Sequence, residues 1–335
     1  MPNQPQNPTH HFSPEELAVA LGKPFPPTEE QAAVIDGPFG PKLVVAGAGA
    51  GKTETMASRV VSLVANGLVR PEQVLGLTFT RKAAQQLEQR IRRQLLTLRS
   101  SGILAPGSAA AEAVENIVPK VSTYDSYAGD LVREYGLLMP VEPSARIITE
   151  AERYAIAHDV VSNYAGSLST GNTVPTVTAT LLNLAQTMDG ELKDPDAVRE
   201  HAEIFRKTAE DLEKSPRTKG EFSQDVQGYL DTQRLRVEYL PLVEALKKEQ
   251  AERGVITFGE QMSIAATLAK NFPLLGEQQS ARYRVVMLDE YQDTSRAQRI
   301  LLRSLFGGPR EGLSVTAVGD PCLLYTSPSP RDLST

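Results

Sequence analysis

The sequence has 335 residues, of which 41% are hydrophobic and 23% charged, and its formal net charge at pH 7 is −6. These values are typical of a folded protein with room for two domains. The single cysteine, Cys322, excludes an internal disulfide and a cysteine metal site, and the four histidines are too scattered for a metal cluster. No apolar run approaches membrane-spanning length and the first residues do not resemble a secretory signal, so we expect a cytoplasmic protein without a membrane partner.

The chain begins with two predicted helices, and each starts with a capping box. Ser13 is followed three residues later by Glu16, and Thr28 by Gln31, with a proline-rich elbow at 24–27 between them. Apolar segments that predict strands follow at 43–46, 74–79, 119–123, 284–288 and 313–318. A helix or loop comes after each strand, which predicts an α/β fold whose parallel sheet is covered by helices on both faces.

The stretch from about 147 to 255 has a different pattern. It contains no β-rich run, and its segments of helical spacing and heavy charge lie at 149–165, 175–190, 195–214 and 225–253. Breaks at 166–172 and 215–220 separate them. This stretch is therefore predicted to be all-helical.

A glycine-rich segment follows the first predicted strand: Ala46-Gly47-Ala48-Gly49-Ala50-Gly51-Lys52-Thr53. Glycines let the backbone turn tightly enough to direct its amides at phosphate oxygens, and the helix expected from Lys52 adds its positive end. Lys52 would reach the outer phosphates, and the Thr53 hydroxyl would bind Mg²⁺. The generic P-loop has glycine at the place of Ala46, so this residue needs a negative φ.

Two adjacent acids, Asp289 and Glu290, follow the predicted strand 284–288. Open parallel sheets hold their ligands at this end of the strands, so Asp289 can bind Mg²⁺ through water and Glu290 can orient the water that attacks the γ-phosphoryl group. The alternative is that both are ordinary turn acids and that Asp293-Thr294-Ser295 caps the next helix. The P-loop earlier in the chain favours the catalytic interpretation, and the capping is compatible with it.

These segments resemble a known family. Asp289-Glu290-Tyr291-Gln292-Asp293 resembles motif II of the UvrD/Rep-type superfamily 1 DNA helicases, and the glycine-rich segment resembles their motif I, including its first alanine. Thr28-Glu29-Glu30-Gln31 resembles their glutamine motif, in which the Gln31 amide would read the adenine edge. The resemblance runs from about Pro14 to Pro321 and implies a RecA-like P-loop fold with ATP and Mg²⁺ as cofactors.

The resemblance also implies a domain organisation. A disordered head at 1–13 would precede motor domain 1A, formed by 14–146 and 256–321. The helical stretch at 147–255 would be the insertion 1B, which interrupts domain 1A.

Two further segments resemble single-strand DNA contacts. Thr78-Phe79-Thr80-Arg81-Lys82-Ala83-Ala84 resembles motif Ia, and residues 121–127 resemble the next contact motif, with Tyr124-Asp125 in place of the usual Phe-His. The implied DNA-binding residues are Thr78, Phe79, Thr80, Arg81, Lys82, Thr123 and Tyr124. Six cations stand against the single acid Glu88 between residues 78 and 100: Arg81, Lys82, Arg90, Arg92, Arg93 and Arg99. The charge excess alone fits a solvated helix face equally well, and Phe79 favours DNA because it can stack on a base.

The resemblance stops after Pro321. Where the family has a glutamine that senses the γ-phosphate, this chain has Leu323. Residues 322–332 match the translation of a transposase-type sequencing adapter, the alternative being a natural Pro/Ser-rich linker. We therefore expect 322–335 to be a non-native tail on an N-terminal fragment.

The implied function is that of an ATP-dependent 3′-to-5′ DNA helicase, with Glu290, Lys52 and Asp289 as catalytic residues and translocation on single-stranded DNA in the intact parent. The fragment itself is expected to be nearly inactive, because in this family arginines of a second motor domain neutralise the charge that develops in the transition state. One alternative is an ATP- and DNA-binding module without catalysis. Another is a subunit of a helicase–nuclease complex, because motif Ia and Pro26-Pro27-Thr28 also resemble AdnB-like helicase–nuclease subunits, which implies a helicase–nuclease partner subunit. A P-loop GTPase would need an Asn-Lys-x-Asp motif, which the sequence lacks.

Overall fold

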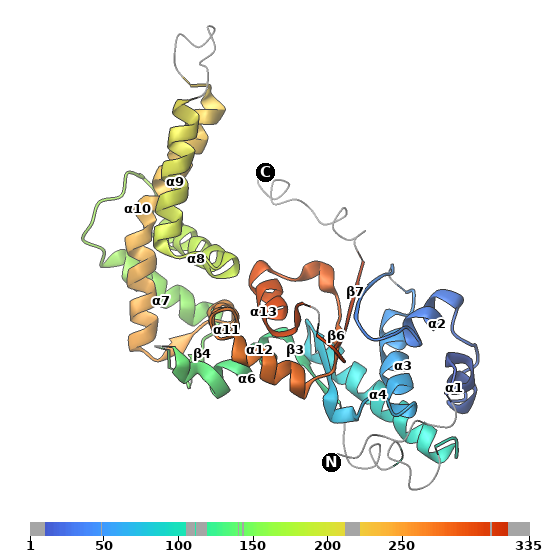
Figure 1. The fold of residues 1–335 in the computed structure, drawn as a ribbon. Helices are drawn as coiled ribbons and strands as arrows, with labels where there is room; N and C mark the ends of the chain where they lie inside the picture. Colours follow the sequence, from blue (N-terminus) through green and yellow to red (C-terminus); the bar gives the residue numbers. More distant parts are fainter. Residues whose placement is uncertain are drawn as a thin grey trace. The chain divides into compact units, whose positions relative to one another are not determined.

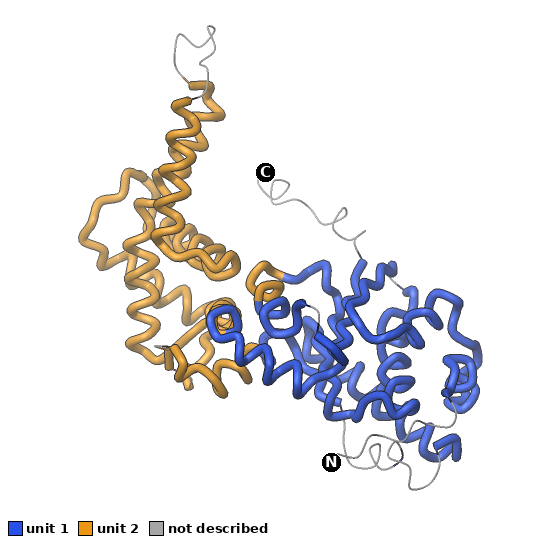
Figure 2. The backbone as a smooth tube through the Cα atoms, viewed as in Figure 1, with its two compact units in different colours: residues 1–127, 269–294, 301–335 blue, residues 128–268, 295–300 orange. Residues whose placement is uncertain are grey.

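The computed structural model describes residues 11–47, 49–104, 111, 119–139, 141–142, 144–211, 222–308 and 310–320. Of the residues singled out above, Ala48 lies outside the described residues, as do most of the expected head and all of the expected tail at 322–335. The chain divides into two compact units (Figure 2). Unit 1 comprises 1–127, 269–294 and 301–335, and unit 2 comprises 128–268 and 295–300.

Unit 1 is built on a parallel sheet of five strands in the order β1-β7-β6-β2-β3 (Figure 1). Every neighbouring pair is parallel. The strands are β1 (Pro41–Val45), β2 (Val74–Thr78), β3 (Lys120–Thr123), β6 (Val285–Leu288) and β7 (Ser314–Gly319). All five expected strands are therefore present within a few residues of their predicted bounds, and the predicted parallel α/β architecture is confirmed.

The helices of unit 1 carry the expected capping signals. They include α1 (Pro14–Ala20), α2 (Glu29–Ile35), α3 (Lys52–Ala65), α4 (Arg81–Ser100), α12 (Pro273–Arg282) and the first turn of α6 (Tyr124–Tyr135). Both predicted capping boxes form, at Ser13 and at Thr28. Apolar residues of α3 and α4 pack with the strands in one core, which holds Met56, Val60, Leu87, Ile91 and Val285.

The edge strand β1 differs from the other strands in its exposure. Leu43 and Val45 are 69% and 63% exposed, whereas β2 and β6 are buried throughout. An edge strand has only one neighbour, and the chain beyond Asp320 of the neighbouring β7 lies outside the described residues. The expectation of helices over both faces therefore holds for the central strands rather than for every strand of the sheet.

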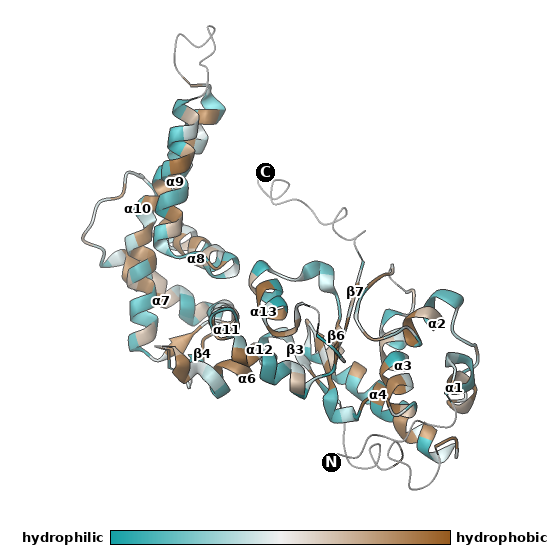
Figure 3. Cartoon of the chain, in the orientation of Figure 1, coloured by the Kyte–Doolittle hydropathy of each residue, from teal (hydrophilic) through white to brown (hydrophobic). Residues whose placement is uncertain are grey.

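Unit 2 is helical, as predicted. Its helices are α7 (Glu150–Ser162), α8 (Val174–Glu191), α9 (Pro195–Glu210), α10 (Gln224–Glu252) and most of α11 (Phe258–Asn271). They enclose a separate core that contains Ile156, Leu181, Met188, Leu240 and Val243. In Figure 3 the helices of this unit alternate between hydrophobic and hydrophilic stretches, the pattern expected of helices that bury one face.

One pair of strands was not predicted. β4 (Arg146–Ile147) and β5 (Val255–Ile256) form a two-stranded parallel pair in unit 2. Strands of two residues carry no detectable alternation, so the sequence cannot indicate them.

Three of the four boundaries between the two units lie inside helices, one of them in α13 (Arg296–Phe306), and the fourth lies between Thr294 and Ser295. The other two fall within α6 and α11, whereas the sequence-based boundaries near 146 and 256 fall at β4 and β5. The assignment of residues to domains 1A and 1B stays a prediction. No helix in the described part of the chain is long and apolar enough to cross a membrane.

Candidate nucleotide site

The candidate residues of unit 1 follow the carboxyl ends of the sheet strands. Because all five strands are parallel, the segments after Val45, Thr78, Thr123, Leu288 and Gly319 lie at one edge of the sheet. Ligands of open α/β sheets bind at this edge. Segments separated by more than 200 residues in the sequence are therefore brought together here.

The P-loop backbone has the conformation that its glycines allow. Gly49 and Gly51 both have a φ of +79°, which a residue with a side chain rarely adopts. Ala46 is not among the described residues with positive φ, so the alanine fits the place of the usual glycine. Its N–H donates to the Gly319 carbonyl at 3.1 Å, which joins the start of the loop to β7. The helix α3 begins at Lys52, as predicted.

Gln31 is held against the P-loop. Its Nε2 donates to the Ala50 carbonyl at 3.2 Å, and its Oε1 accepts from the Thr28 N–H at 3.1 Å. A Cβ at Gly51 would lie only 3.0 Å from Gln31 Nε2, so the glycine also permits this approach. A small cavity of about 180 Å³ beside Gln31 is lined by Phe25, Pro26 and Glu54, among other residues. A planar ligand in this cavity would lie next to the Gln31 amide.

Lys52 and Glu290 form an ion pair across the site. The Lys52 Nζ lies 3.3 Å from Glu290 Oε2, and the lysine side chain is only 11% exposed. The pair connects the first residue of α3 with the residue after β6, which are 238 positions apart. The cation expected at the phosphates and the carboxylate expected at the attacking water are therefore neighbours.

Asp289 is buried, with 6% of its surface exposed. Burial, and then the charge of Glu290, raise the pKa of the Asp289 carboxyl. Its Oδ1 accepts from the Glu290 N–H at 3.1 Å, which leaves the second oxygen available to a ligand. Glu290 itself has a φ of +48°, a left-handed conformation that is strained for a non-glycine residue.

Gln292 connects Glu290 to the end of β7, an interaction that sequence reasoning missed. Its Nε2 donates to Glu290 Oε2 at 2.9 Å, and its Oε1 accepts from the Asp320 N–H at 2.9 Å. A Cβ at Gly319 would lie 2.7 Å from Gln292 Oε1, so the glycine makes this connection possible. The adjacency of β6 and β7, which places Gln292 beside Asp320, is not visible in the sequence. The predicted helix cap is also present, because Ser295 Oγ accepts from the Gln298 N–H.

Glu54, the residue after Thr53, was not singled out from the sequence. Its carboxylate lies 2.6 Å from Lys23 Nζ and 2.7 Å from Arg90, and it accepts from Gln94 Nε2 at 2.8 Å. These interactions hold the start of α3 against α4. They also remove Arg90 from the group of free cations expected on α4, because its charge is paired inside the fold.

The residues expected to bind DNA differ in how exposed their side chains are. Thr80, Arg81 and Lys82 are exposed and Phe79 is half-buried, whereas Thr78, Thr123 and Tyr124 are buried. Within the described residues, Arg81 and Lys82 have no ion pair. Thr80 caps α4 by accepting from the Ala83 N–H at 3.1 Å, and Thr123 caps the start of α6 by accepting from the Ser126 N–H at 3.0 Å. The buried members therefore shape the surface that the exposed members present.

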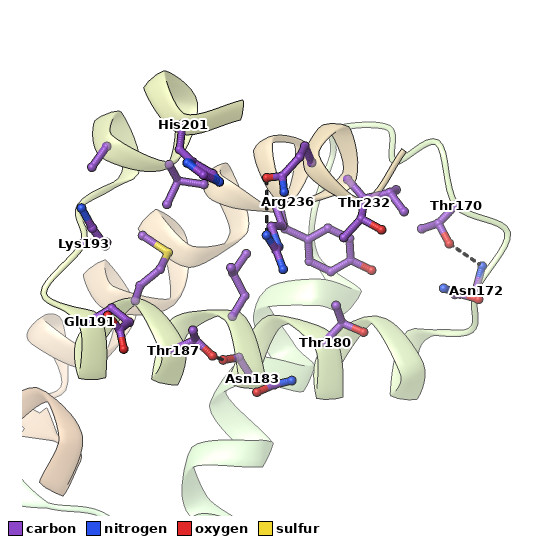
Figure 4. Close-up of a pocket in the computed structure, with 17 residues that line it drawn as sticks. Thr170, Asn172, Thr180, Asn183, Thr187, Glu191, Lys193, His201, Thr232 and Arg236 are labelled. Atoms are coloured by element: carbon purple, nitrogen blue, oxygen red, sulfur yellow. Dashed lines mark hydrogen bonds between the residues drawn. The ribbon is translucent and has the colours of Figure 1, made fainter. Parts of the chain in front are cut away.

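A larger cavity, of about 610 Å³, lies in unit 2 among α8, α9 and α10 (Figure 4). Its lining includes Met188, Lys193, His201, Arg236 and Tyr239, and none of the predicted site residues. No group of three or more His, Cys, Asp or Glu side chains that could hold a metal ion occurs in the part of the chain that the structure describes. The predicted Mg²⁺ donors, Thr53 and Asp289, fit an ion that takes one or two protein oxygens and completes its shell with phosphate oxygens and water.

The parallel sheet, the P-loop conformation and the acids after β6 define an α/β P-loop domain of the RecA-like kind. A family model, UvrD/REP helicase N-terminal domain, matches residues 27–322, and the chain belongs to this family. The resemblance found in the sequence is thereby confirmed.

Curated relatives agree with this assignment. The chain is 25% identical over 306 residues to ATP-dependent DNA helicase UvrD2 of Mycobacterium tuberculosis, which covers 91% of the chain and 38% of the relative. It is 26% identical over 300 residues to ATP-dependent DNA helicase UvrD1 of Mycobacterium leprae, covering 89% and 32%. ATP-dependent DNA helicase PcrA of Bacillus subtilis is 25% identical over 280 residues, covering 84% and 31%. The chain thus spans between about a third and two fifths of the length of these relatives.

Proposed function

We propose that this chain is the ATP-binding motor part of a UvrD/Rep-type 3′-to-5′ DNA helicase, which in the intact protein couples ATP hydrolysis to translocation on single-stranded DNA. The observation that carries the proposal is the ion pair between Lys52 of the P-loop and Glu290 after β6. This contact supports a site in which Lys52 binds the phosphates and the Glu290 carboxylate orients the attacking water. Phosphoryl transfer needs both residues.

The site residues have separate roles in this proposal. Gln31 and the P-loop residues 46–53 bind ATP, and Thr53 and Asp289 bind the Mg²⁺ that accompanies it. Mg²⁺ neutralises charge on the phosphates. Lys52 turns from Glu290 toward the outer phosphates when ATP is present, and the Glu290 carboxylate is then available to accept a proton from the attacking water. Gln292 keeps this carboxylate oriented by its hydrogen bond of 2.9 Å.

Single-stranded DNA is the proposed partner, at the surface formed by Phe79, Thr80, Arg81 and Lys82. Lys and Arg side chains would bind the phosphates, and an aromatic side chain would stack on a base. A cytoplasmic location belongs to the same proposal, whereas a helicase–nuclease partner subunit belongs to the alternative in which the chain is a subunit of a helicase–nuclease complex. The other alternative function is that of a module that binds ATP and DNA without catalysis.

The test is Lys52→Ala, measured by calorimetric titration of the full 335-residue chain with Mg-ATP. Loss of the ammonium group should weaken binding by about 2 to 3 kcal/mol, the size of a charge-assisted hydrogen bond. Lys270→Ala is the matched control, because Lys270 is an exposed lysine of unit 1 on α11. Equal affinities in wild type and Lys52→Ala would show that the proposal is wrong.

A further inference from the structure

Tyr124 lies between the exposed DNA-binding segment and the acid after β6. Phe79 follows β2, Tyr124 follows β3 and Asp289 follows β6, and these three strands are neighbours in the order β6-β2-β3. The rings of Phe79 and Tyr124 are 4.9 Å apart between centroids, at an interplanar angle of 53°. The Tyr124 hydroxyl donates to the Asp289 backbone carbonyl at 3.1 Å. One side chain therefore touches both Phe79 and Asp289.

The burial of these residues makes Tyr124 a link rather than a second DNA-binding residue. Phe79 is half-buried and its neighbours Thr80 and Arg81 are exposed, whereas Tyr124 is only 2% exposed. A base stacked on Phe79 would press on Tyr124 without touching it. Because Tyr124 is packed in a dense interior, a displacement of its ring is passed on to its hydrogen-bond partner.

The backbone of Asp289 is held by this part of the sheet on both sides. Its N–H donates to the Leu77 carbonyl of β2 at 2.9 Å, and its C=O accepts from Tyr124. Leu77 directly precedes the first proposed DNA-contact segment, and Tyr124 lies within the second. A phenol hydroxyl is protonated at neutral pH, so the Tyr124 hydroxyl is a hydrogen-bond donor there.

We propose that Tyr124 is a positioning residue that couples DNA binding at Phe79 to the placement of Asp289, and through it to the affinity for Mg-ATP. The inference rests on the proposed function. Two sites are coupled when both bias the same structural element, and the coupling is reciprocal. The element here is the Asp289 backbone, whose carboxylate is the proposed Mg²⁺ ligand.

Tyr124→Phe tests the inference because it keeps the ring packed on Phe79 and removes only the donor. The measured quantity is the ratio of Mg-ATP dissociation constants without and with a saturating oligothymidine, on the full 335-residue chain. We expect this ratio to be about 5 or more in wild type, which is the lower end of typical allosteric couplings. In Tyr124→Phe the ratio should be below about 2. DNA affinity without nucleotide should be the same in both proteins.

Tyr127→Phe is the matched control. The Tyr127 hydroxyl is also buried, lies one turn further along the same helix and donates to Gln279 Oε1 at 2.9 Å. The variant loses an equivalent hydrogen bond that does not lead to Asp289, so it should keep the wild-type ratio. In EDTA, ATP binds without Mg²⁺, so Asp289 has no ion to bind. The ratio of ATP dissociation constants without and with oligothymidine should then be equal in wild type and Tyr124→Phe.

The outcomes separate this inference from the function on which it rests. Equal ratios in wild type and Tyr124→Phe, a wild-type ratio of 1, or an equal loss in Tyr127→Phe would each overturn the role of Tyr124. If Lys52→Ala weakens Mg-ATP binding in the same experiments, the proposed function survives that result. If Lys52→Ala has no effect, the proposed function itself fails.

Discussion

The Glu290 carboxylate has two partners in the structure. Lys52 forms an ion pair with it, and Gln292 donates a hydrogen bond to the same oxygen. In the proposed function, an ATP molecule at the P-loop draws Lys52 away from Glu290. The pair is partly exposed on the Glu290 side, where 38% of the side chain is accessible, so solvent weakens it. The ion pair therefore opposes nucleotide binding to a modest degree.

Glu290→Gln should accordingly bind Mg-ATP more tightly than wild type. An amide at this position accepts a hydrogen bond from Lys52 but does not neutralise the charge of the lysine. Less interaction energy is therefore lost when Lys52 turns to the phosphates. We expect a gain of about two- to fivefold, the value of a partly exposed ion pair, in calorimetric titrations. Glu277→Gln, which removes an exposed carboxylate on α12, should bind as wild type does. A weaker affinity in Glu290→Gln would contradict this account of the pair.

Glu260 of unit 2 allows a test of pH-dependent stability at a single residue. Burial, and then the charge of Asp189, raise the pKa of Glu260 above its usual value. The folded state thus binds a proton more readily than the unfolded state. The stability that Glu260 contributes is fully present below its unfolded pKa of about 4.3 and is lost as pH rises through the folded value.

Glu260→Gln should therefore raise the melting temperature more at pH 7 than at pH 4. The amide oxygen can still accept from the Thr257 N–H, which Glu260 Oε2 accepts at 2.8 Å. Circular dichroism melts at the two pH values measure the difference, with Glu277→Gln as the exposed control. A larger gain at pH 4 would mean that the direction of the pKa shift is wrong.

At the scale of elements, the contacts of α4 with α3 and its proposed DNA contacts lie on different turns of the helix. Its middle is bound to the start of α3 through Glu54, which pairs with Arg90 and accepts from Gln94. Its first turn presents Arg81 and Lys82, which have no ion pair within the described residues and are exposed. The first turn is therefore the part of the helix that is available to DNA phosphates.

The double variant Arg81→Glu/Lys82→Glu should weaken binding of an oligothymidine and leave Mg-ATP affinity unchanged. The slope of log affinity against log salt concentration should flatten by about 0.7 for each DNA phosphate that the variant no longer neutralises. Fluorescence anisotropy at several salt concentrations measures both effects. Arg92→Glu/Arg93→Glu makes the same charge change about three turns further along α4 and should have a smaller effect. Equal losses in the two double variants would indicate that only net charge matters.

At the scale of the whole molecule, every described residue of the candidate nucleotide site belongs to unit 1, and unit 2 has its own core. Leu181 of that core is fully buried. Truncation of its side chain should affect the stability of unit 2 without changing the P-loop.

Leu181→Ala should destabilise the protein by about 2 to 5 kcal/mol in urea-induced unfolding, the usual cost of removing a buried leucine side chain. Calorimetric Mg-ATP affinity of the folded protein should stay within about twofold of wild type, on the order of measurement scatter. Ile204→Ala is the control, since Ile204 of α9 is 56% exposed and should change stability by about 0.5 kcal/mol or less. A large loss of Mg-ATP affinity in Leu181→Ala would show that the nucleotide site depends on the core of unit 2.

Local sequence patterns were sufficient to predict several elements of the fold. The P-loop glycines, the capping boxes at Ser13 and Thr28, and the apolar strands each depend on a few consecutive residues, so the five strands and the start of α3 could be predicted. The pairing of Asp289 and Glu290 with the P-loop could also be inferred, since phosphoryl transfer requires both. The domain boundaries and the individual site roles stay predictions.

Contacts between side chains that are distant in sequence could not be predicted and are visible only in the folded chain. The strand order β1-β7-β6-β2-β3 places Gln292 beside Asp320 and Tyr124 beside Asp289, and no local pattern encodes that order. The same holds for Glu54, whose partners Lys23 and Arg90 lie 31 residues before it and 36 after it, so that a cation counted toward DNA binding is paired within the fold. Hydrogen bonds and ion pairs act over a few ångströms in space, whatever the separation in sequence, which is why the sequence could suggest site residues such as Lys52 and Asp289 but not the contacts of Gln292 and Glu54.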